Sequence, residues 1–259
     1  MKTFDGGQTI DWGRISGEYA RYRPGYPESF YRRIFALGIG LPGQCILDLG
    51  TGTGVLARRF ARDGCHVTGV DSSPIQIETA RELAQRDRVT PEFLVRPAED
   101  TGLPERSFDV VTAAQSWLYF DGQKAAREVK RVLIPEGRLM TCFLVWLPRQ
   151  DEIARRSEEL ILQFNPEWSG KDWDGYVPPI YDWAKDYFDL TGMFWYDEAL
   201  EFTRESWRGR MRACRGTGVV LDPERLRQFD EIHDRLLREI AGERFTVLHR
   251  IAAHILKPK

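Results

Sequence analysis

A glycine-rich turn between an apolar strand and a helix constrains this chain more than any other feature. Residues 46–49 form a short apolar run with one acid, Asp48, which is typical of a buried parallel strand. Residues 50–54 then read Gly-Thr-Gly-Thr-Gly, and residues 55–61 have the apolar spacing of one helix face. Glycine is needed where a backbone turns sharply or touches a ligand, and a helix start leaves N–H groups free to bind. The sequence therefore predicts a ligand-binding strand, turn and helix.

The spacing of the turn separates two classes of nucleotide-binding fold. Dinucleotide enzymes use Gly-x-Gly-x-x-Gly, whereas here the third glycine is Gly54 and Asp48 precedes the turn. Asp-x-Gly-x-Gly-x-Gly resembles the first motif of class I S-adenosylmethionine-dependent methyltransferases. In that family the turn wraps the methionine and ribose part of the cofactor, which implies contacts for Gly50, Thr51 and Gly52. The family's preceding acid, Asp48 here, lies near the cofactor's amino group. The alternative is a turn that only connects a strand to a helix.

A second acid ends the next predicted strand, residues 66–71. Asp71 lies about twenty residues after the first glycine of the turn, where dinucleotide folds place an acid that accepts hydrogen bonds from both ribose hydroxyls. We expect Asp71 to bind the ribose, and the alternative is a solvated carboxylate. Ser72 and its neighbours predict the start of the next helix, on which Gln76 stands where relatives have an apolar residue near the adenine. Ser72 and Gln76 are therefore predicted neighbours of the cofactor.

Further segments resemble the same family, and together the motifs cover about residues 16–145. The family often has Asp-Ala-Glu after its third strand, and this chain has Pro97 in place of the first acid. The resemblance implies adenine contacts for Ala98 and Glu99, with an exposed loop acid as the alternative for Glu99. Gln115 follows the fourth predicted strand, at the carboxyl edge where ligands bind in such sheets. We expect Gln115 to contact the cofactor as well.

The segment from Ser16 to Pro27 carries tyrosines, arginines and prolines close together. It resembles the N-terminal segment of the small-molecule branch of the family, which includes trans-aconitate-type methyltransferases. There, an aromatic residue and an arginine close over the cofactor's carboxylate. The resemblance implies this role for Tyr19, Tyr22 and Arg23, and an arginine fork suits a carboxylate. The alternative is that the tyrosines pack a helix onto the sheet.

The resemblance also implies the architecture, a doubly wound α/β fold with a mostly parallel, seven-stranded, Rossmann-like sheet. We predict an N-terminal cap at 1–40, a cofactor-binding core at 41–147 and 197–259, and an aromatic-rich helical insertion at 148–196 between the fifth and sixth strands. In relatives, this position holds a lid over the substrate. Aromatic side chains offer rigid surface with polar tips, so these either pack the insertion onto the core or line a pocket or an oligomer interface.

Methyl transfer from a sulfonium is an in-line displacement, and holding two reactants in line supplies about 7–11 kcal/mol. A general base adds about 10²–10⁴-fold only when the nucleophile must lose a proton. Relatives often have a histidine where this chain has Leu118. Tyr119 and His249 are the candidate bases, unless the acceptor ionises easily, and a buried structural histidine is the alternative for His249. No metal is required, and the sequence has no metal-ligand spacing.

A predicted helix at 205–214 carries several arginines, for which a solvated face is the default interpretation. An anion site made by one of them is the alternative. The arginines are Arg208, Arg210, Arg212 and, just beyond, Arg215.

Composition narrows the choice of function. The 259 residues carry a net charge of −2 with acids and bases interspersed, which disfavours nucleic acid and anionic membranes as partners. Four widely spaced cysteines predict free thiols in a reducing compartment. With no signal peptide and no long apolar run, we expect a cytoplasmic protein, monomeric or homodimeric.

The sequence thus predicts an enzyme that transfers a methyl group from S-adenosyl-L-methionine to a small, partly apolar or aromatic acceptor, with S-adenosylhomocysteine as by-product. The acceptor atom is left open among O, N, S and C nucleophiles. One alternative is a cofactor-binding protein of the same fold with other chemistry or a regulatory role, since fold does not fix function. The other is an RNA or protein methyltransferase, which would be expected to show a basic stripe or an added domain.

Overall fold

The computed structural model describes residues 12–259, and the chain divides into two compact units. Unit 1 comprises residues up to Pro24 together with Leu144–Tyr176 and Tyr196–Ile251. Unit 2 comprises Gly25–Phe143, Val177–Trp195 and Ala252–Lys259. The first eleven residues of the predicted N-terminal cap lie outside the described residues.

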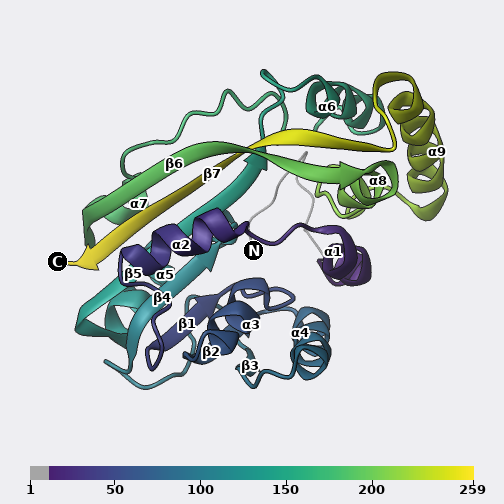
Figure 1. The fold of residues 1–259 in the computed structure, drawn as a ribbon. Coiled ribbons are helices and arrows are strands. Elements are labelled where there is room, and N and C mark those ends of the chain that lie inside the picture. The colour runs from purple at the N-terminus through teal and green to yellow at the C-terminus, as the bar shows by residue number, and fades with distance from the viewer. Residues whose placement is uncertain (1–11) are drawn as a thin grey trace. The chain divides into compact units, whose positions relative to one another are not determined.

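One seven-stranded sheet is formed within the described residues, in the order β3-β2-β1-β4-β5-β7-β6. The strands are β1 (Cys45–Leu49), β2 (His66–Asp71), β3 (Glu92–Val95), β4 (Phe108–Ala114), β5 (Leu133–Trp146), β6 (Phe188–Thr203) and β7 (Arg244–Pro258). The pairs of β1 with β2, β1 with β4, β2 with β3 and β4 with β5 are parallel, and β7 runs antiparallel (Figure 1). The predicted doubly wound, mostly parallel α/β fold is confirmed.

The helices of unit 2 pack apolar faces against strands as their periodicity predicts. They are α2 (Glu28–Ala36), α3 (Val55–Arg62), α4 (Pro74–Asp87), the 3-10 turn η2 (Trp117–Tyr119), α5 (Gly122–Val132) and α7 (Asp182–Lys185). In α3 the buried side chains are Leu56, Ala57 and Phe60. In α4, Pro74 occupies the first helical position and the Ser73 hydroxyl accepts a hydrogen bond from the Gln76 N–H, which fixes where the helix begins.

Unit 1 holds a second hydrophobic core around Trp207 and Phe229. Its helices are η1 (Trp12–Ile15), α1 (Ser16–Tyr22), α6 (Glu152–Phe164), α8 (Arg204–Arg212) and α9 (Pro223–Ile240). The Ser157 hydroxyl joins three of them, because it accepts from Trp207 Nε1 at 3.0 Å and lies 3.0 Å from His233 Nε2. This shared hydroxyl satisfies buried polar atoms that would otherwise destabilise the core.

β5 begins at Leu133, and Pro135 lies in an irregular stretch of this strand where the register shifts between Phe108 and Val110. β6 begins earlier than the sequence predicts, because the predicted insertion ends at residue 196 whereas β6 begins at Phe188. Residues 188–196 of the predicted insertion therefore belong to β6. An edge strand exposes much of its surface and needs no strict alternation of apolar residues. Its sequence pattern therefore does not show where the strand begins.

The four cysteines are free thiols, with Cys65, Cys142 and Cys214 buried and Cys45 half-buried, as predicted. No helix in residues 12–259 is long and apolar enough to cross a membrane.

Candidate functional site

The glycine turn at the carboxyl end of β1 leaves a surface bare of side chains. Gly50 and Gly52 both adopt left-handed backbone, with φ of 61° and 55°. A Cβ on Gly50 would lie 2.5 Å from the Ser116 Cβ, so this glycine is required by close packing as well as by its conformation. A Cβ on Gly52 would meet only Gln76 Oε1, at 3.9 Å. Room therefore remains above Gly52 for a ligand to approach the backbone.

Asp48 holds this turn in place from below. Its carboxylate is buried and accepts hydrogen bonds from Thr51 Oγ1 and from Thr112 Oγ1, both at 2.6 Å. Thr51 belongs to the turn and Thr112 to β4, so one side chain connects the turn to the neighbouring strand. Burial raises the pKa of Asp48 to about 6, although both hydroxyls favour the charged form. The observed role of Asp48 is thus to fix the turn, and its predicted proximity to the cofactor's amino group remains a prediction.

Asp71 lies at the end of β2 and faces the same turn. Its Oδ2 accepts from the Gly52 N–H at 3.0 Å, and its Oδ1 accepts from the Ser73 N–H at 2.9 Å. Each carboxylate oxygen has a second lone pair, so Asp71 can accept two more hydrogen bonds while staying fixed. Burial raises the pKa of Asp71, and the two backbone N–H groups oppose that shift. This is the arrangement that binding paired hydroxyls requires.

The remaining cofactor candidates of unit 2 lie in the segments that follow β2, β3 and β4 along the chain. Ser72 is exposed, Gln76 is buried on α4, and Ala98 is buried after β3. Glu99 is half-buried and accepts from the Asp121 N–H at 2.7 Å, so it is tethered to the start of α5. Gln115 follows β4 with a left-handed φ of 56°. That conformation is uncommon for a non-glycine residue and is frequent at functional sites.

Tyr19, Tyr22 and Arg23 lie in unit 1, whereas the glycine turn lies in unit 2. The Tyr22 hydroxyl donates to Glu205 Oε1 at 2.8 Å, and its ring fills the space beside Gly209. The Arg23 guanidinium lies 4.8 Å from the centre of the Tyr19 ring. Tyr22 therefore packs α1 onto α8, and the cofactor role of all three residues remains a prediction.

The two candidate bases differ sharply in environment. Tyr119 lies half-buried in η2 of unit 2, packed against the core. His249 of unit 1 is fully buried and stacks on Phe202, with its ring centre 5.7 Å from that of Phe202. Its Nδ1 lies 2.8 Å from the Val247 carbonyl oxygen, which only accepts, so Nδ1 carries the proton and Nε2 a lone pair. Burial lowers the pKa of His249 to about 4, below the ordinary histidine value, so His249 is a weaker base than an exposed histidine.

Sequence reasoning missed two side chains that support the turn, and for Arg210 it favoured a solvated position over the anion site named as the alternative. Ser116 donates to the Leu49 carbonyl at 2.8 Å, and Thr112 pairs with Asp48. Their partners lie more than sixty positions away, and sequence spacing gives no sign of them. Arg210 is buried on α8 beside Trp207 and Met211. Trp207 was the available signal, because a residue three positions earlier lies on the same side of a helix.

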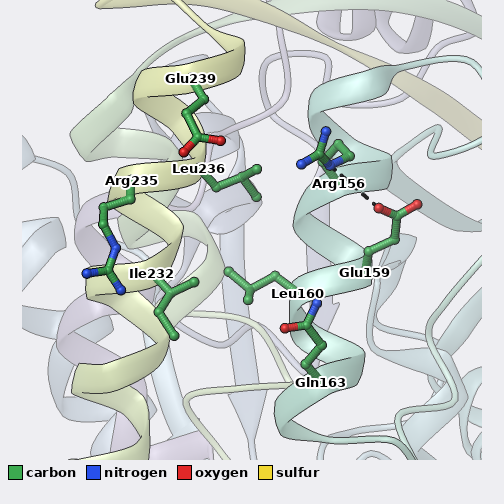
Figure 2. A pocket seen from close by; sticks show the side chains of 8 residues that line it. All are labelled: Arg156, Glu159, Leu160, Gln163, Ile232, Arg235, Leu236 and Glu239. Atoms are coloured by element: carbon green, nitrogen blue, oxygen red, sulfur yellow. Dashed lines mark ion pairs between the residues drawn. The ribbon is translucent and has the colours of Figure 1, made fainter.

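A separate groove of about 300 Å³ lies between α6 and α9 of unit 1 (Figure 2). Leu160, Ile232 and Leu236 form its apolar part, and charged side chains border it. None of the sequence-predicted site residues lines this groove. Among residues 12–259, no cluster of three or more metal-ligating side chains has the arrangement of a metal site.

Comparison with known proteins finds a family match that includes the glycine turn. Residues 47–141, which span β1 to β5, match the family described as a methyltransferase domain. Residues 47–141 therefore form a methyltransferase domain of the class predicted from the glycine turn. The cofactor of this family is S-adenosyl-L-methionine, which serves as methyl donor.

Curated relatives match part of this chain. An uncharacterized methyltransferase of Mycobacterium tuberculosis is 35% identical over 148 residues, 56% of each chain. A ubiquinone biosynthesis O-methyltransferase of Cereibacter sphaeroides is 31% identical over 59% of this chain and 62% of its own. The match thus spans little more than half the length of these curated relatives. A solved structure of a candidate type II methyltransferase from Anaeromyxobacter dehalogenans has a TM-score of 0.60 at 22% identity, covering 91% of this chain and 97% of its own, which shows a shared fold.

Replacing Asp48 by Asn should change how stability depends on pH. Because the pKa of Asp48 is raised to about 6 from 3.8, the folded state binds more protons than the unfolded state between these values. This group's contribution to the free energy of unfolding therefore falls as pH rises through that window, by up to about 3 kcal/mol. Urea unfolding should show the stability of Asp48→Asn rising relative to the native protein from pH 4 to pH 7.

Thr112→Val provides a second test of the same account, because it removes a hydrogen bond that favours the charged form of Asp48. The fall in stability should then extend above pH 6. A stability difference between Asp48→Asn and the native protein that does not vary with pH would contradict the buried-carboxylate account.

Replacing Gly52 by Ala should separate backbone strain from ligand contact. Gly52 and Gly43 both have positive φ, 55° and 85°, and neither has a protein atom closer than 3.9 Å to an added Cβ. Alanine at either position should lower the free energy of unfolding by about 1–2 kcal/mol. Only Gly52→Ala should also weaken S-adenosylmethionine binding, by a factor of about ten or more, because its Cβ occupies the ligand's approach. Calorimetry showing equal affinity for the two variants would refute contact at Gly52.

Proposed function

We propose that this protein transfers a methyl group from S-adenosylmethionine to a small-molecule acceptor. The observation that carries the proposal is the pairing of Gly52 with Asp71. The bare left-handed glycine and the carboxylate that accepts its N–H are adjacent, and both retain capacity for a ligand. The match of residues 47–141 to the methyltransferase family supports the same conclusion.

Each unit 2 candidate has a role in holding the cofactor. Asp71 accepts from the ribose hydroxyls, and the backbone at residues 50–52 carries the methionine part. Ala98 and Glu99 contact the adenine edge, with Gln76 beside it. Gln115 contacts the cofactor from the end of β4. Asp48 acts indirectly, since its two threonine partners fix the turn on which the others depend.

The cofactor supplies an activated methyl group, so the protein's main task is to align the two reactants. A base is needed only if the acceptor atom carries a proton. The lone pair on His249 Nε2 has no hydrogen-bond partner within the described chain. Its pKa of about 4 leaves this nitrogen unprotonated at neutral pH and makes it a weaker base than an ordinary histidine. Tyr119 is the second candidate, and an acceptor that is already an anion would need neither.

A small, partly apolar acceptor fits the chain better than a macromolecule. The net charge of −2 gives no basic surface of the kind that nucleic acid binding needs. The relative from Cereibacter sphaeroides is named for a step of ubiquinone biosynthesis, which suggests an aromatic or apolar acceptor here also. The aromatic insertion at 148–196 would cover such an acceptor, in a cytoplasmic monomer or homodimer.

Calorimetry with S-adenosylmethionine and NADH tests the cofactor assignment. We expect S-adenosylmethionine to bind and NADH not to bind measurably. Asp71→Ala should weaken binding by about 1.5–3 kcal/mol, since a charged acceptor is lost. Glu82→Ala, which removes an exposed acid from α4, should leave the affinity unchanged. Preference for NADH, or full affinity in Asp71→Ala, would overturn the assignment.

A panel of phenol, carboxylate, amine and thiol acceptors tests the chemistry itself. Incubation with S-adenosylmethionine should yield S-adenosylhomocysteine and one methylated acceptor class. Tight binding of S-adenosylmethionine with no transfer to any class would favour a regulatory or other cofactor-dependent role.

A further inference from the structure

Arg210 stands apart from the other arginines of α8. Three other arginines of this helix form ion pairs. Arg204 pairs with Glu243, and Arg208 pairs with Asp230 and Asp234. Arg212 pairs with Glu18, Glu205 and Asp230. Arg210 is only 5% exposed, and its Nε and Nη1 have no hydrogen-bond partner. No acid within residues 12–259 forms an ion pair with it. A buried, unpaired guanidinium is costly to a folded protein, so its presence calls for a ligand.

The surroundings of Arg210 within unit 1 favour an anion. Its guanidinium carbon lies 4.7 Å from the centre of the Trp146 ring, a stacking that holds the fork in one orientation. A second cation, Arg23, lies near enough to help lower the pKa of Arg210 to about 10, after burial itself. An arginine fork with no ion pair among residues 12–259 suits a carboxylate, which accepts from it in two parallel hydrogen bonds.

A second unsatisfied group lies in the same unit. His249 Nε2 offers a lone pair and has no partner, and the charges of Arg210 and Arg23 contribute to lowering the pKa of His249. Within the described chain Arg210 therefore lacks an anion, and His249 Nε2 lacks an O–H or N–H donor. A proton-bearing nucleophile would supply the latter.

We propose that unit 1 carries a carboxylate-binding site centred on Arg210, and that the carboxylate is part of the methyl acceptor. The existence of the site follows from unit 1 alone, whereas its assignment to the acceptor rests on the proposed function. The same chemistry could be met by the carboxylate of S-adenosylmethionine, so the test must separate the two sources.

The first arm measures carboxylate binding without S-adenosylmethionine. Thermal unfolding of the full chain would be followed with benzoate, 4-hydroxybenzoate, succinate and citrate, each against its amide counterpart. At least one carboxylate should raise the Tm of the native protein, because a ligand of the folded state stabilises it, and the amide should not. Arg210→Met should bind that carboxylate at least about tenfold more weakly. If no carboxylate stabilises the native protein more than Arg210→Met, the site does not exist.

The second arm tests whether Arg210→Met still folds. Arg210→Met should be as stable as the native protein or more so, because it replaces an unpaired buried charge by an apolar side chain of similar length. Arg204→Gln, the control on the same helix, should keep full carboxylate affinity. A large loss of stability in Arg210→Met would show that the arginine is structural and would overturn the proposal.

The third arm distinguishes the source of the carboxylate. S-adenosylhomocysteine should bind Arg210→Met and the native protein with equal affinity by calorimetry. A tenfold or greater loss would assign Arg210 to the cofactor and overturn its assignment to the acceptor. Failure of methyl transfer to every acceptor would defeat the proposed function, but it would leave the carboxylate binding of the first arm unaffected.

Discussion

The buried carboxylate of Asp48 is the constraint on which the rest of the cofactor site depends. Two threonine hydroxyls converge on it, one from the glycine turn and one from β4. Burial of this acid raises its pKa. The hydrogen bonds of the carboxylate fix a left-handed turn that its glycines alone would leave flexible. Gly52 can then present its N–H to Asp71 in a fixed direction. Burial of a polar group thus lowers the stability of the folded protein but fixes the geometry of a site.

The two units hold different candidate residues. Unit 2 contains the whole of the family match and the glycine turn, so its features are those expected of any protein that holds this cofactor. Unit 1 contains the unpaired Arg210 and the buried His249, which the family match does not cover. The proposed carboxylate site would place acceptor choice in unit 1, at the arginine of α8 that forms no ion pair.

Local patterns in the sequence predicted most of the fold. The apolar run before the turn, the periodicity of α3 and the acid at the end of β2 each reflect short-range physics, and the structure has a strand, a helix and a strand at these places. The start of β6 was missed because an exposed edge strand has no strict alternation. The pairing of Asp48 with Thr112 depends on strand neighbours 64 positions apart. The burial of Arg210 depends on which side of α8 faces the core, and the arginine-rich pattern of that helix suggested solvent instead.

Structure determination with S-adenosylhomocysteine bound is the most direct test of the central claim. The ribose hydroxyls should donate to the two carboxylate oxygens of Asp71, and the ligand should lie against the bare backbone at Gly52. The Asp48 hydrogen bonds to Thr51 and Thr112 should be unchanged from those described above. A ligand bound elsewhere, or one whose ribose makes no contact with Asp71, would contradict the account.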